Sequence, residues 1–224
     1  LAVLGVYRYR INELLKRQAI RNKIAQDLHD NVGSTLSSIS VYSQVAKIYK
    51  QTDKQEALQD TLEKISETSG EMISEMNDIV WAINPRNDNM ATIVQRMESF
   101  ARPLLASQEI RFHFDYPEQI LQMHLEMTKR KNFYLIFKEA INNALKYARA
   151  NHIWVRIQLH HKELELEVRD DGIGFDPEGP KRAGSLSGNG LVNIRLRAKE
   201  MKGECVIKSQ PGAGAIVRLI VAVP

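Results

Sequence analysis

The spacing of hydrophobic residues changes once along this chain of 224 residues, and the change divides it into two parts. From about residue 11 to residue 84, apolar side chains recur with helical spacing and no segment alternates as a strand does. Beyond about residue 110, several segments alternate between apolar and polar residues, with helical segments among them. The pattern therefore predicts an α+β fold, in which an all-helical part precedes a sheet with helices packed on it.

The first part is predicted to be an antiparallel helical hairpin. The heptad is clearest in the second helix, at Leu58, Leu62, Ile65, Ser69, Met72, Met76, Ile79 and Ile83. Thr52 and Gln55 have the spacing of a capping box between the helices, and Asn84-Pro85 is expected to end the second helix. A hairpin buries only one stripe of each helix, so two copies are expected to pair as a four-helix bundle in a homodimer.

Composition and charge limit the partners that the chain can have. The net charge is +4, and the basic residues are dispersed apart from one N-terminal cluster, less dense than a nucleic-acid-binding surface requires, so no nucleic-acid partner is expected. The single cysteine, Cys205, excludes an internal disulfide and favours a reducing compartment.

Residues 1–10 pass from apolar residues into tyrosines and arginines, as the cytoplasmic end of a transmembrane helix does. We expect this stub to follow a membrane anchor that precedes the sequence, with the remainder on the cytoplasmic side of the membrane. The alternative is a frayed apolar terminus.

The second part, beginning at about residue 85, is predicted to alternate helices and strands. A helix is expected over 86–108, with an apolar face formed by Ile93, Met97, Phe100, Leu104 and Leu105. Strands are expected at 110–116, 152–159, 163–168 and 215–222, and further helices at about 128–149 and 190–201.

The helix at about 128–149 has one apolar face and one polar face. At about 100° per residue, the apolar face holds Phe133, Phe137, Ala140, Ile141, Ala144 and Ala148, and the polar face holds Glu139, Asn142, Asn143 and Lys146. An acid, an amide oxygen and an ammonium group within two turns can bind Mg²⁺ and phosphate, because Mg²⁺ needs few protein oxygens when phosphates supply the rest. Taken alone, the helix is better explained by a solvated polar face.

Two glycine motifs follow in the chain. Asp170-Asp-Gly172-Ile-Gly174 comes at the end of a predicted strand, where glycines allow close approach to a flat ligand and a carboxylate can accept a hydrogen bond from an exocyclic amine. An ordinary Asp-Gly turn is the alternative. After a polar segment at 177–187, Gly188-Asn-Gly190 opens a helix, and such helix N-termini favour phosphate. The chain has no Walker A sequence, which excludes a P-loop enzyme.

His29 is predicted to lie on the first long helix and is followed directly by Asp30. Imidazole is largely neutral near pH 7, so a ring nitrogen is free to attack, and a neighbouring acid can orient the ring. Most such pairs are solvated surface residues, but this pair precedes all the parts of a nucleotide site.

The order of these motifs resembles the Bergerat ATP-binding fold that gyrase, heat-shock ATPase and histidine-kinase domains share. With His29-Asp30 on a preceding hairpin, the whole chain is similar to the catalytic core of a sensor histidine kinase. The His29-to-Gly33 segment, the Asp78-to-Pro85 segment and Glu139-to-Ala144 look most like the nitrate-sensor and membrane-fluidity-sensor type. The resemblance implies a dimerisation and phosphotransfer domain at 11–84 and a Bergerat-type α/β sandwich ATP-binding domain at 85–224.

The resemblance also implies a role for each matched residue. His29 would accept the phosphoryl group, and Asp30 would polarise the imidazole of His29. Glu139 would be the catalytic acid of the ATP site, Asn143 the Mg²⁺ ligand and Asp170 the adenine-binding carboxylate. The remaining nucleotide contacts would come from Asn142, Lys146, Gly172, Gly174, Gly188 and Gly190. ATP and Mg²⁺ are the implied cofactors, and an aspartate on a response-regulator receiver domain is the implied acceptor.

The chain departs from the pattern of this subfamily at two positions. Tyr147 stands where histidine is common, and Ser34 stands where members that dephosphorylate their partner carry the glutamine that orients the attacking water. We therefore expect kinase activity with little phosphatase activity. Residues 84–90 are the predicted hinge between the two domains.

Two other classes of function remain open from the sequence. The first alternative is a Bergerat-type ATPase that hydrolyses ATP to drive a conformational clamp, with no chemical role for His29. The second alternative is a degenerate nucleotide-binding signalling module without turnover. Retention of a phosphoryl group on His29 would separate the kinase from both.

Overall fold

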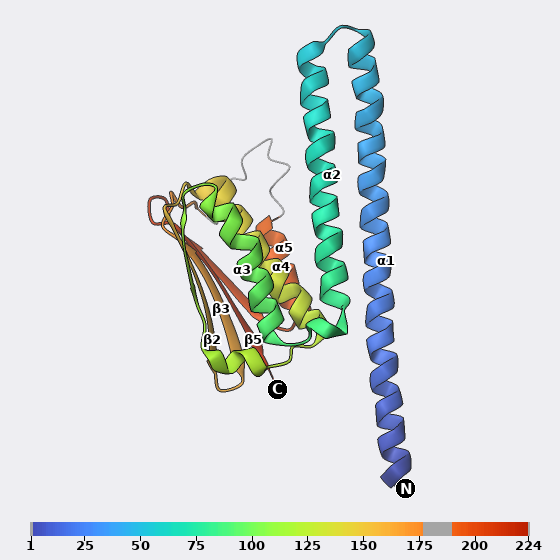
Figure 1. Ribbon diagram of the computed structural model, residues 1–224, viewed down its shortest axis with the longest axis vertical. Coiled ribbons are helices and arrows are strands. Elements are labelled where there is room, and N and C mark those ends of the chain that lie inside the picture. Colours follow the sequence, from blue (N-terminus) through green and yellow to red (C-terminus); the bar gives the residue numbers. More distant parts are fainter. Residues whose placement is uncertain (1, 177–189, 224) are drawn as a thin grey trace. The chain divides into compact units, whose positions relative to one another are not determined.

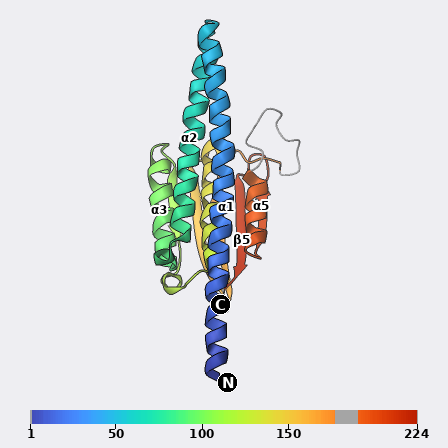
Figure 2. The same cartoon turned by 90° about the vertical axis from the view of Figure 1, so that its right-hand side faces the viewer.

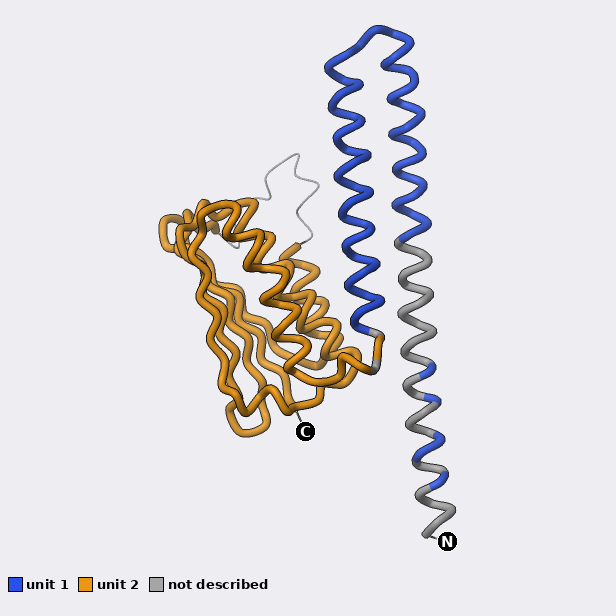
Figure 3. Tube along the Cα trace, in the orientation of Figure 1, with its two compact units in different colours: residues 1–83 blue, residues 84–224 orange. Residues whose placement is uncertain are grey.

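The structure is a computed structural model that describes residues 2–176 and 190–223. Within these ranges, side chains are described except at 2–6, 8–9, 12–14, 16–17, 19–31, 83 and 85. The chain divides into two compact units, Leu1–Ile83 and Asn84–Pro224, which are coloured separately in Figure 3. The first is all-helical and the second contains a sheet, so the predicted α+β class is confirmed.

The first unit is a hairpin of two antiparallel helices. α1 spans Ala2–Gln51 and α2 spans Gln55–Ile83 (Figure 1). The second helix ends just before Asn84-Pro85, as predicted, because the residue preceding a proline disfavours helical geometry. The helices pack along their length and bury small or flexible apolar side chains such as Ala46 and Met72.

The turn of the hairpin differs from its prediction. The hydroxyl of Thr52 donates to the carbonyl of Ile48 at 2.9 Å and so closes the last turn of α1. Because α2 begins only at Gln55, Thr52 lies too far ahead of it to cap its first turn, and the predicted capping box is wrong.

The predicted stub at 1–10 forms the first turns of α1 from Ala2 onward. In the described part of the chain, no helix combines the length and the apolar character needed to cross a membrane.

The second unit contains a five-stranded sheet in the order β1-β2-β3-β5-β4. The strands are β1 Arg111–Asp115, β2 His152–His160, β3 Glu163–Asp170, β4 Glu204–Ser209 and β5 Ala215–Ala222. β1 and β2 are parallel, since the chain between them crosses over through a helix, and the other neighbouring pairs are antiparallel.

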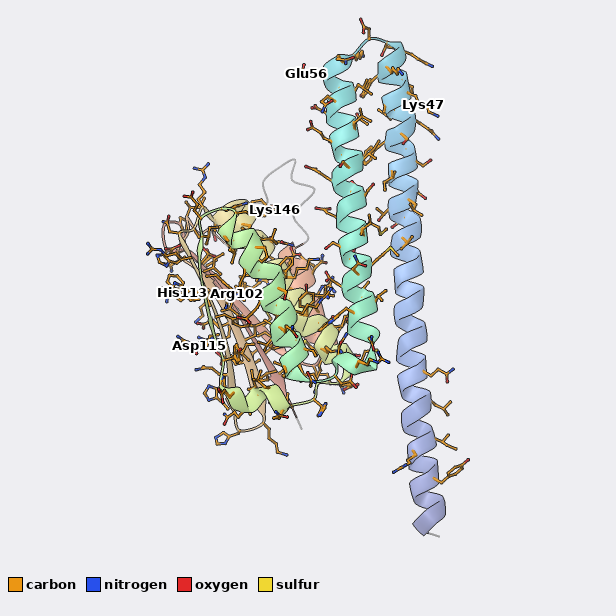
Figure 4. All side chains as sticks on the ribbon, viewed as in Figure 1. Lys47, Glu56, Arg102, His113, Asp115 and Lys146 are labelled. Carbon is orange, nitrogen blue, oxygen red and sulfur yellow. The ribbon has the colours of Figure 1, made fainter. Side chains whose placement is uncertain are left out.

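In the described part of this unit, α3 Met90–Ala106, α4 Met127–Asn143 and α5 Gly190–Glu200 cover one face of the sheet (Figure 1). Figure 2 shows α3 and α5 on the two sides of this layer, and α4 contacts both. The core between the layers includes fully buried Phe133, Phe137 and Ile141 on α4, which face inward-pointing strand residues such as Ile153. On the opposite face, His113 and Asp115 project from β1 (Figure 4). The predicted α/β sandwich is confirmed.

Two details of this unit differ from the sequence prediction. β4 was not expected, because as an edge strand paired only with β5 it buries no side chain fully and alternates weakly. α3 begins at Met90 and not at residue 86, because Asn89 caps it by accepting a hydrogen bond from the Thr92 N–H at 2.9 Å. On that helix Leu104 is exposed, so its assignment to the apolar face is wrong, whereas its neighbour Leu105 is buried.

Candidate nucleotide site

The helix α4 positions the first wall of the candidate site. Every residue predicted for its apolar face, from Phe133 to Ala148, is buried, and Glu139, Asn142 and Asn143 on the other face are half-buried. At Ala144 the α-helix gives way to a π-helix that ends at Ala148. Hydrogen bonds in a π turn span five residues, and such turns often occur at functional sites.

Lys146 lies within this π-helix. Its side chain is exposed (Figure 4), whereas Glu139 and Asn143, which were predicted to share its polar face, are half-buried. An exposed ammonium at the end of the helix remains suited to a phosphate group, which arrives from solvent.

The N-terminus of α5 lies against the polar residues of α4. Gly190 is the first residue of α5, and a Cβ built on it would lie 2.2 Å from Oε1 of Glu139 and 3.4 Å from Nδ2 of Asn143. Only a glycine therefore allows this close approach. The first N–H groups of a helix have no partners inside the helix and carry partial positive charge. Glu139, Asn143 and a helix N-terminus thus converge at one place.

Asp170 closes β3 and lies on the inner side of the sheet with only 8% of its surface exposed. Its Oδ1 accepts a hydrogen bond from the N–H of Gly172 at 2.9 Å. Burial raises the pKa of Asp170 above its usual value, although the N–H groups of Gly172 and Ala215 partly oppose the shift. A buried carboxylate of this kind is suited to recognise a neutral donor such as an exocyclic amine.

The loop that follows Asp170 is fixed to the end of the π-helix and to the segment before β5. The N–H of Ile173 donates to the carbonyl of Ala148 at 2.8 Å. Gly174 has a φ of +61°, and a Cβ there would lie 2.0 Å from the carbonyl oxygen of Gln210. Ser209 joins the same region, because its hydroxyl accepts from the Phe175 N–H at 2.8 Å and donates to the Gly214 carbonyl at 2.7 Å. The loop is therefore a rigid second wall.

Asp171 is a positioning residue to which the sequence analysis assigned no role. Its Oδ1 accepts hydrogen bonds from the N–H groups of Asn151 at 2.8 Å and His152 at 2.9 Å. Burial is the largest single influence and opposes ionisation, but the backbone N–H groups together outweigh it and hold the pKa of Asp171 below its usual value. The carboxylate thereby joins the end of β3 to the segment that follows the π-helix. No pattern in the sequence distinguishes it from the first aspartate of the pair.

The site has the donor set for Mg²⁺ carried by a nucleotide. Nδ2 of Asn143 is buried and has no hydrogen-bond partner among the residues that the structure describes. Turning the amide by 180° about its last side-chain bond would place the oxygen there instead. Glu139 supplies a carboxylate beside it. Within residues 2–176 and 190–223, no three His, Cys, Asp or Glu side chains are grouped to hold a metal ion. Few protein oxygens suffice when phosphates supply other ligands, so the residues fit the ion.

Some of the predicted site residues lie outside what the structure describes. Gly188 belongs to the segment 177–189, and the side chains of His29 and Asp30 fall in the part of α1 whose side chains are not described. The backbone at His29 and Asp30 is α-helical, as predicted. The structure therefore brings together Glu139, Asn143 and Gly190, and it joins Asp170 and Gly172 to the end of the same helix at Ala148.

Comparison with known families agrees with this arrangement. Residues 128–224 match the model of the histidine kinase-, DNA gyrase B- and HSP90-like ATPases, and residues 21–88 match a histidine kinase model, HisKA_3. The second unit is thus an ATP-binding domain of the class that these three groups of proteins share. Since a histidine kinase hairpin precedes it, the chain belongs to the histidine kinase family. The matches are consistent with a catalytic core of the nitrate-sensor type.

Two relatives extend the match over most of the chain. An uncharacterized sensor-like histidine kinase of Chloroflexus aurantiacus is 26% identical over 212 residues, which cover 94% of this chain and 35% of the relative. The oxygen sensor histidine kinase NreB of Staphylococcus carnosus is 26% identical over 209 residues, which cover 91% of this chain and 56% of NreB. The chain thus spans about a third and just over half of these relatives.

Solved structures with the same fold are also histidine kinases. Acinetobacter baumannii AdeS matches with a TM-score of 0.55 and 13% identity, covering 83% of this chain and 97% of AdeS. The blue-light activated histidine kinase EL346 of Erythrobacter litoralis matches with a TM-score of 0.56 and 13% identity, covering 81% of this chain and 59% of EL346. At this identity the likeness concerns the fold alone.

Proposed function

We propose that this chain is the catalytic core of a two-component sensor histidine kinase. It would phosphorylate itself on His29 with the γ-phosphoryl group of ATP and pass that group to an aspartate of a response regulator. The observation that carries the proposal is the convergence of Glu139, Asn143 and the N-terminus of α5 beside Gly190. The histidine kinase hairpin that precedes this site supports it, because a nucleotide site alone would fit an ATPase equally well.

The ATP-binding unit would orient the substrate through its two walls. Asp170 would accept a hydrogen bond from the exocyclic amine of adenine, and the loop at Gly172 and Gly174 would lie against the flat base. Asn142, Asn143, Lys146 and the glycines at 188 and 190 would contact the phosphates or the ion bound to them. Phosphoryl transfer needs positioning and charge stabilisation above all, and these residues supply both.

In the first transfer, a ring nitrogen of His29 uses its lone pair to form a bond to the γ-phosphorus. The bond from that phosphorus to the β–γ bridging oxygen breaks, and ADP leaves with the electron pair. Asp30 would accept a hydrogen bond from the other ring N–H and so favour the attacking tautomer. Glu139 is the candidate acid-base group beside the phosphates. In the second transfer, a carboxylate oxygen of the regulator forms a bond to phosphorus as the nitrogen–phosphorus bond breaks.

Asn143 would bind Mg²⁺ together with the phosphates, and Mg²⁺ when bound neutralises the charge of the transferring group. The buried amide of Asn143, whose nitrogen has no hydrogen-bond partner in the described part of the chain, supports this assignment. The Glu139 carboxylate lies close to both the Asn143 amide and the N-terminus of α5. It would therefore fix the position of that amide relative to the backbone N–H groups that bind phosphate.

We further propose that two copies pair through the hairpin. Leu62, Ile73 and Val80 on α2 are about half exposed and lie on one line of the helix. A stripe of this kind is expected to be covered by a second copy in a four-helix bundle. The apolar residues at 1–6 are consistent with an anchor that continues into a membrane, with both units on its cytoplasmic side.

The test is incubation of the full chain with γ-labelled ATP and Mg²⁺. A kinase retains a label on the protein that acid removes and alkali does not. Release of labelled phosphate without retention on the protein would indicate an ATPase. Nucleotide binding with neither result would indicate a signalling module without turnover.

A further inference from the structure

The linker that follows α2 is built into the ATP-binding unit from its first residue. Residues Pro85–Asn87 form a turn of 3-10 helix, closed by the Asn87 N–H on the carbonyl of Asn84 at 3.1 Å. The carbonyl of Asp88 accepts from the Leu125 N–H at 3.0 Å, and the Met90 N–H donates to the carbonyl of Met123 at 2.9 Å. The segment predicted as a hinge is therefore hydrogen-bonded to the same unit along its length.

A buried arginine holds this linker. Arg130 lies near the start of α4 with only 1% of its surface exposed. Its Nη1 forms an ion pair with Oδ1 of Asp88, and its Nη2 donates to the carbonyl of Asn84 at 3.4 Å. Burying a guanidinium group is costly unless charged and polar partners compensate. The buried Arg130 side chain therefore requires Asp88 and Asn84 of the linker to stay in this position.

The same helix carries the nucleotide site. Arg130 and Asn143 belong to one continuous α-helix, with Glu139 between them. A helix packed in a core moves as a rigid element, because its close-packed surroundings deform little. Arg130 therefore joins Asn84, which directly follows α2, to the helix α4 that holds Glu139 and Asn143. It lies more than two helical turns from Glu139 along α4.

We propose that Arg130, with Asp88, is a positioning residue for phosphoryl transfer, which fixes the start of the linker on the nucleotide-binding helix. This inference rests on the proposed kinase function. A fixed linker limits the orientations that the ATP-binding unit can take toward His29 and so raises the fraction in which the γ-phosphate is in line for attack. Loosening the linker lowers the rate of transfer at saturating ATP and leaves ATP affinity unchanged.

The test compares Asp88→Asn, Arg130→Lys and Arg130→Met in the full chain. Asp88→Asn is the main variant, because the Asp88 side chain is 44% exposed and its replacement keeps the fold even if Arg130→Met does not. The matched control is Glu98→Gln, which removes a more exposed ion pair with Arg102 on α3. Three quantities are measured for each: the rate of autophosphorylation over a range of ATP concentrations, the Kd of a fluorescent ATP analogue, and the melting temperature.

The expected result is a fall of about tenfold in kcat for Asp88→Asn, since orientation of reactants carries much of the barrier lowering. The Kd of the analogue and the KM for ATP stay within about twofold, Arg130→Lys recovers part of the rate, and Glu98→Gln behaves as wild type. Unchanged kcat in Asp88→Asn, or a rise of Kd equal to the fall in rate, overturns the positioning role. A wild-type chain that retains no label overturns the kinase proposal and this inference together.

Discussion

Gly190 and Glu139 approach so closely that a Cβ on Gly190 would lie 2.2 Å from Oε1 of Glu139. The atom in the way belongs to the far end of a flexible side chain. Gly190→Ala is therefore expected to fold, with Glu139 displaced from the N-terminus of α5. We predict a fall in autophosphorylation on the order of tenfold or more, since misplaced groups cost that much in transfer reactions.

The control for this variant is Gly70→Ala. Gly70 lies on α2, and a Cβ there would contact nothing within 4 Å. Alanine favours helix by about 1 kcal/mol over glycine, so the control should melt at a higher temperature and keep its activity. If Gly190→Ala is autophosphorylated as fast as wild type, phosphoryl transfer does not depend on the position of Glu139 beside the N-terminus of α5.

Asp170→Asn is predicted to abolish nucleotide binding and to stabilise the fold near neutral pH. Because the pKa of Asp170 is raised by burial, the folded protein favours the protonated acid. That contribution to stability is fully present below the pKa of the unfolded chain and is lost as pH rises through the raised pKa of the folded protein. The neutral amide mimics the protonated acid and can still accept from the Gly172 N–H.

The measurement is the melting temperature of wild type and Asp170→Asn as a function of pH, beside the Kd of a fluorescent ATP analogue. The variant should melt higher at pH 7, and the difference should shrink as the pH falls to about 4. Asp115→Asn, on the exposed face of β1, is the control and should change neither quantity. A variant that binds the analogue normally would place the adenine elsewhere.

Much of this arrangement is predictable because it depends on periodicity and on backbone geometry that few residues allow. The 3.6-residue period of α4 gives its buried face correctly from Phe133 to Ala148, and glycine motifs mark the turns at Gly174 and Gly190. The π-helix at Ala144–Ala148 was not predictable, because no residue pattern in the sequence announces it. β4 was missed because an edge strand needs no strong alternation.

The contacts that the sequence did not reveal all join residues far apart in the chain. Asp171 accepts from the backbone of Asn151 and His152, and any aspartate after a strand would look the same in the sequence. Likewise, the residues next to Arg130 in the sequence do not indicate that it pairs with Asp88, which only the folded chain brings close to it. Such partners are set by tertiary structure and not by local propensity.

Ile73→Asp is predicted to convert the chain to a monomer. The heptad positions Met72 and Ile79 are already buried within one copy, whereas Ile73 is 61% exposed and shares a line with Leu62 and Val80. A carboxylate buried there by a second copy would lack a partner, at a cost of several kcal/mol. The dimer dissociation constant should rise by about a hundredfold or more, measured by sedimentation.

The matched control is Lys64→Asp, which changes the charge on the opposite side of α2, about 180° around the helix from Ile73. Its side chain is exposed, so it should leave the dimer intact. A dimer that survives Ile73→Asp, with helical content unchanged in both variants, would show that a different surface pairs the copies.

Ser34→Gln is predicted to increase phosphatase activity. Ser34 is exposed on α1, so the helix can accept the longer side chain, and glutamine is a better helix former than serine. An amide that orients the attacking water is expected to raise the rate on the order of a hundredfold. The measurement is the decay of phosphorylated regulator with ADP-bound wild type and variant. Fast decay with wild type, or no gain in the variant, would mean that another group orients the water.

The central claim is that His29 carries the phosphoryl group. The most direct measurement is the retention of label from γ-labelled ATP by wild type and by His29→Gln, with nucleotide affinity determined for both. The account predicts an acid-labile, alkali-stable label on wild type and none on His29→Gln, at equal affinity for the fluorescent ATP analogue. Label of the same stability and amount on His29→Gln would contradict it.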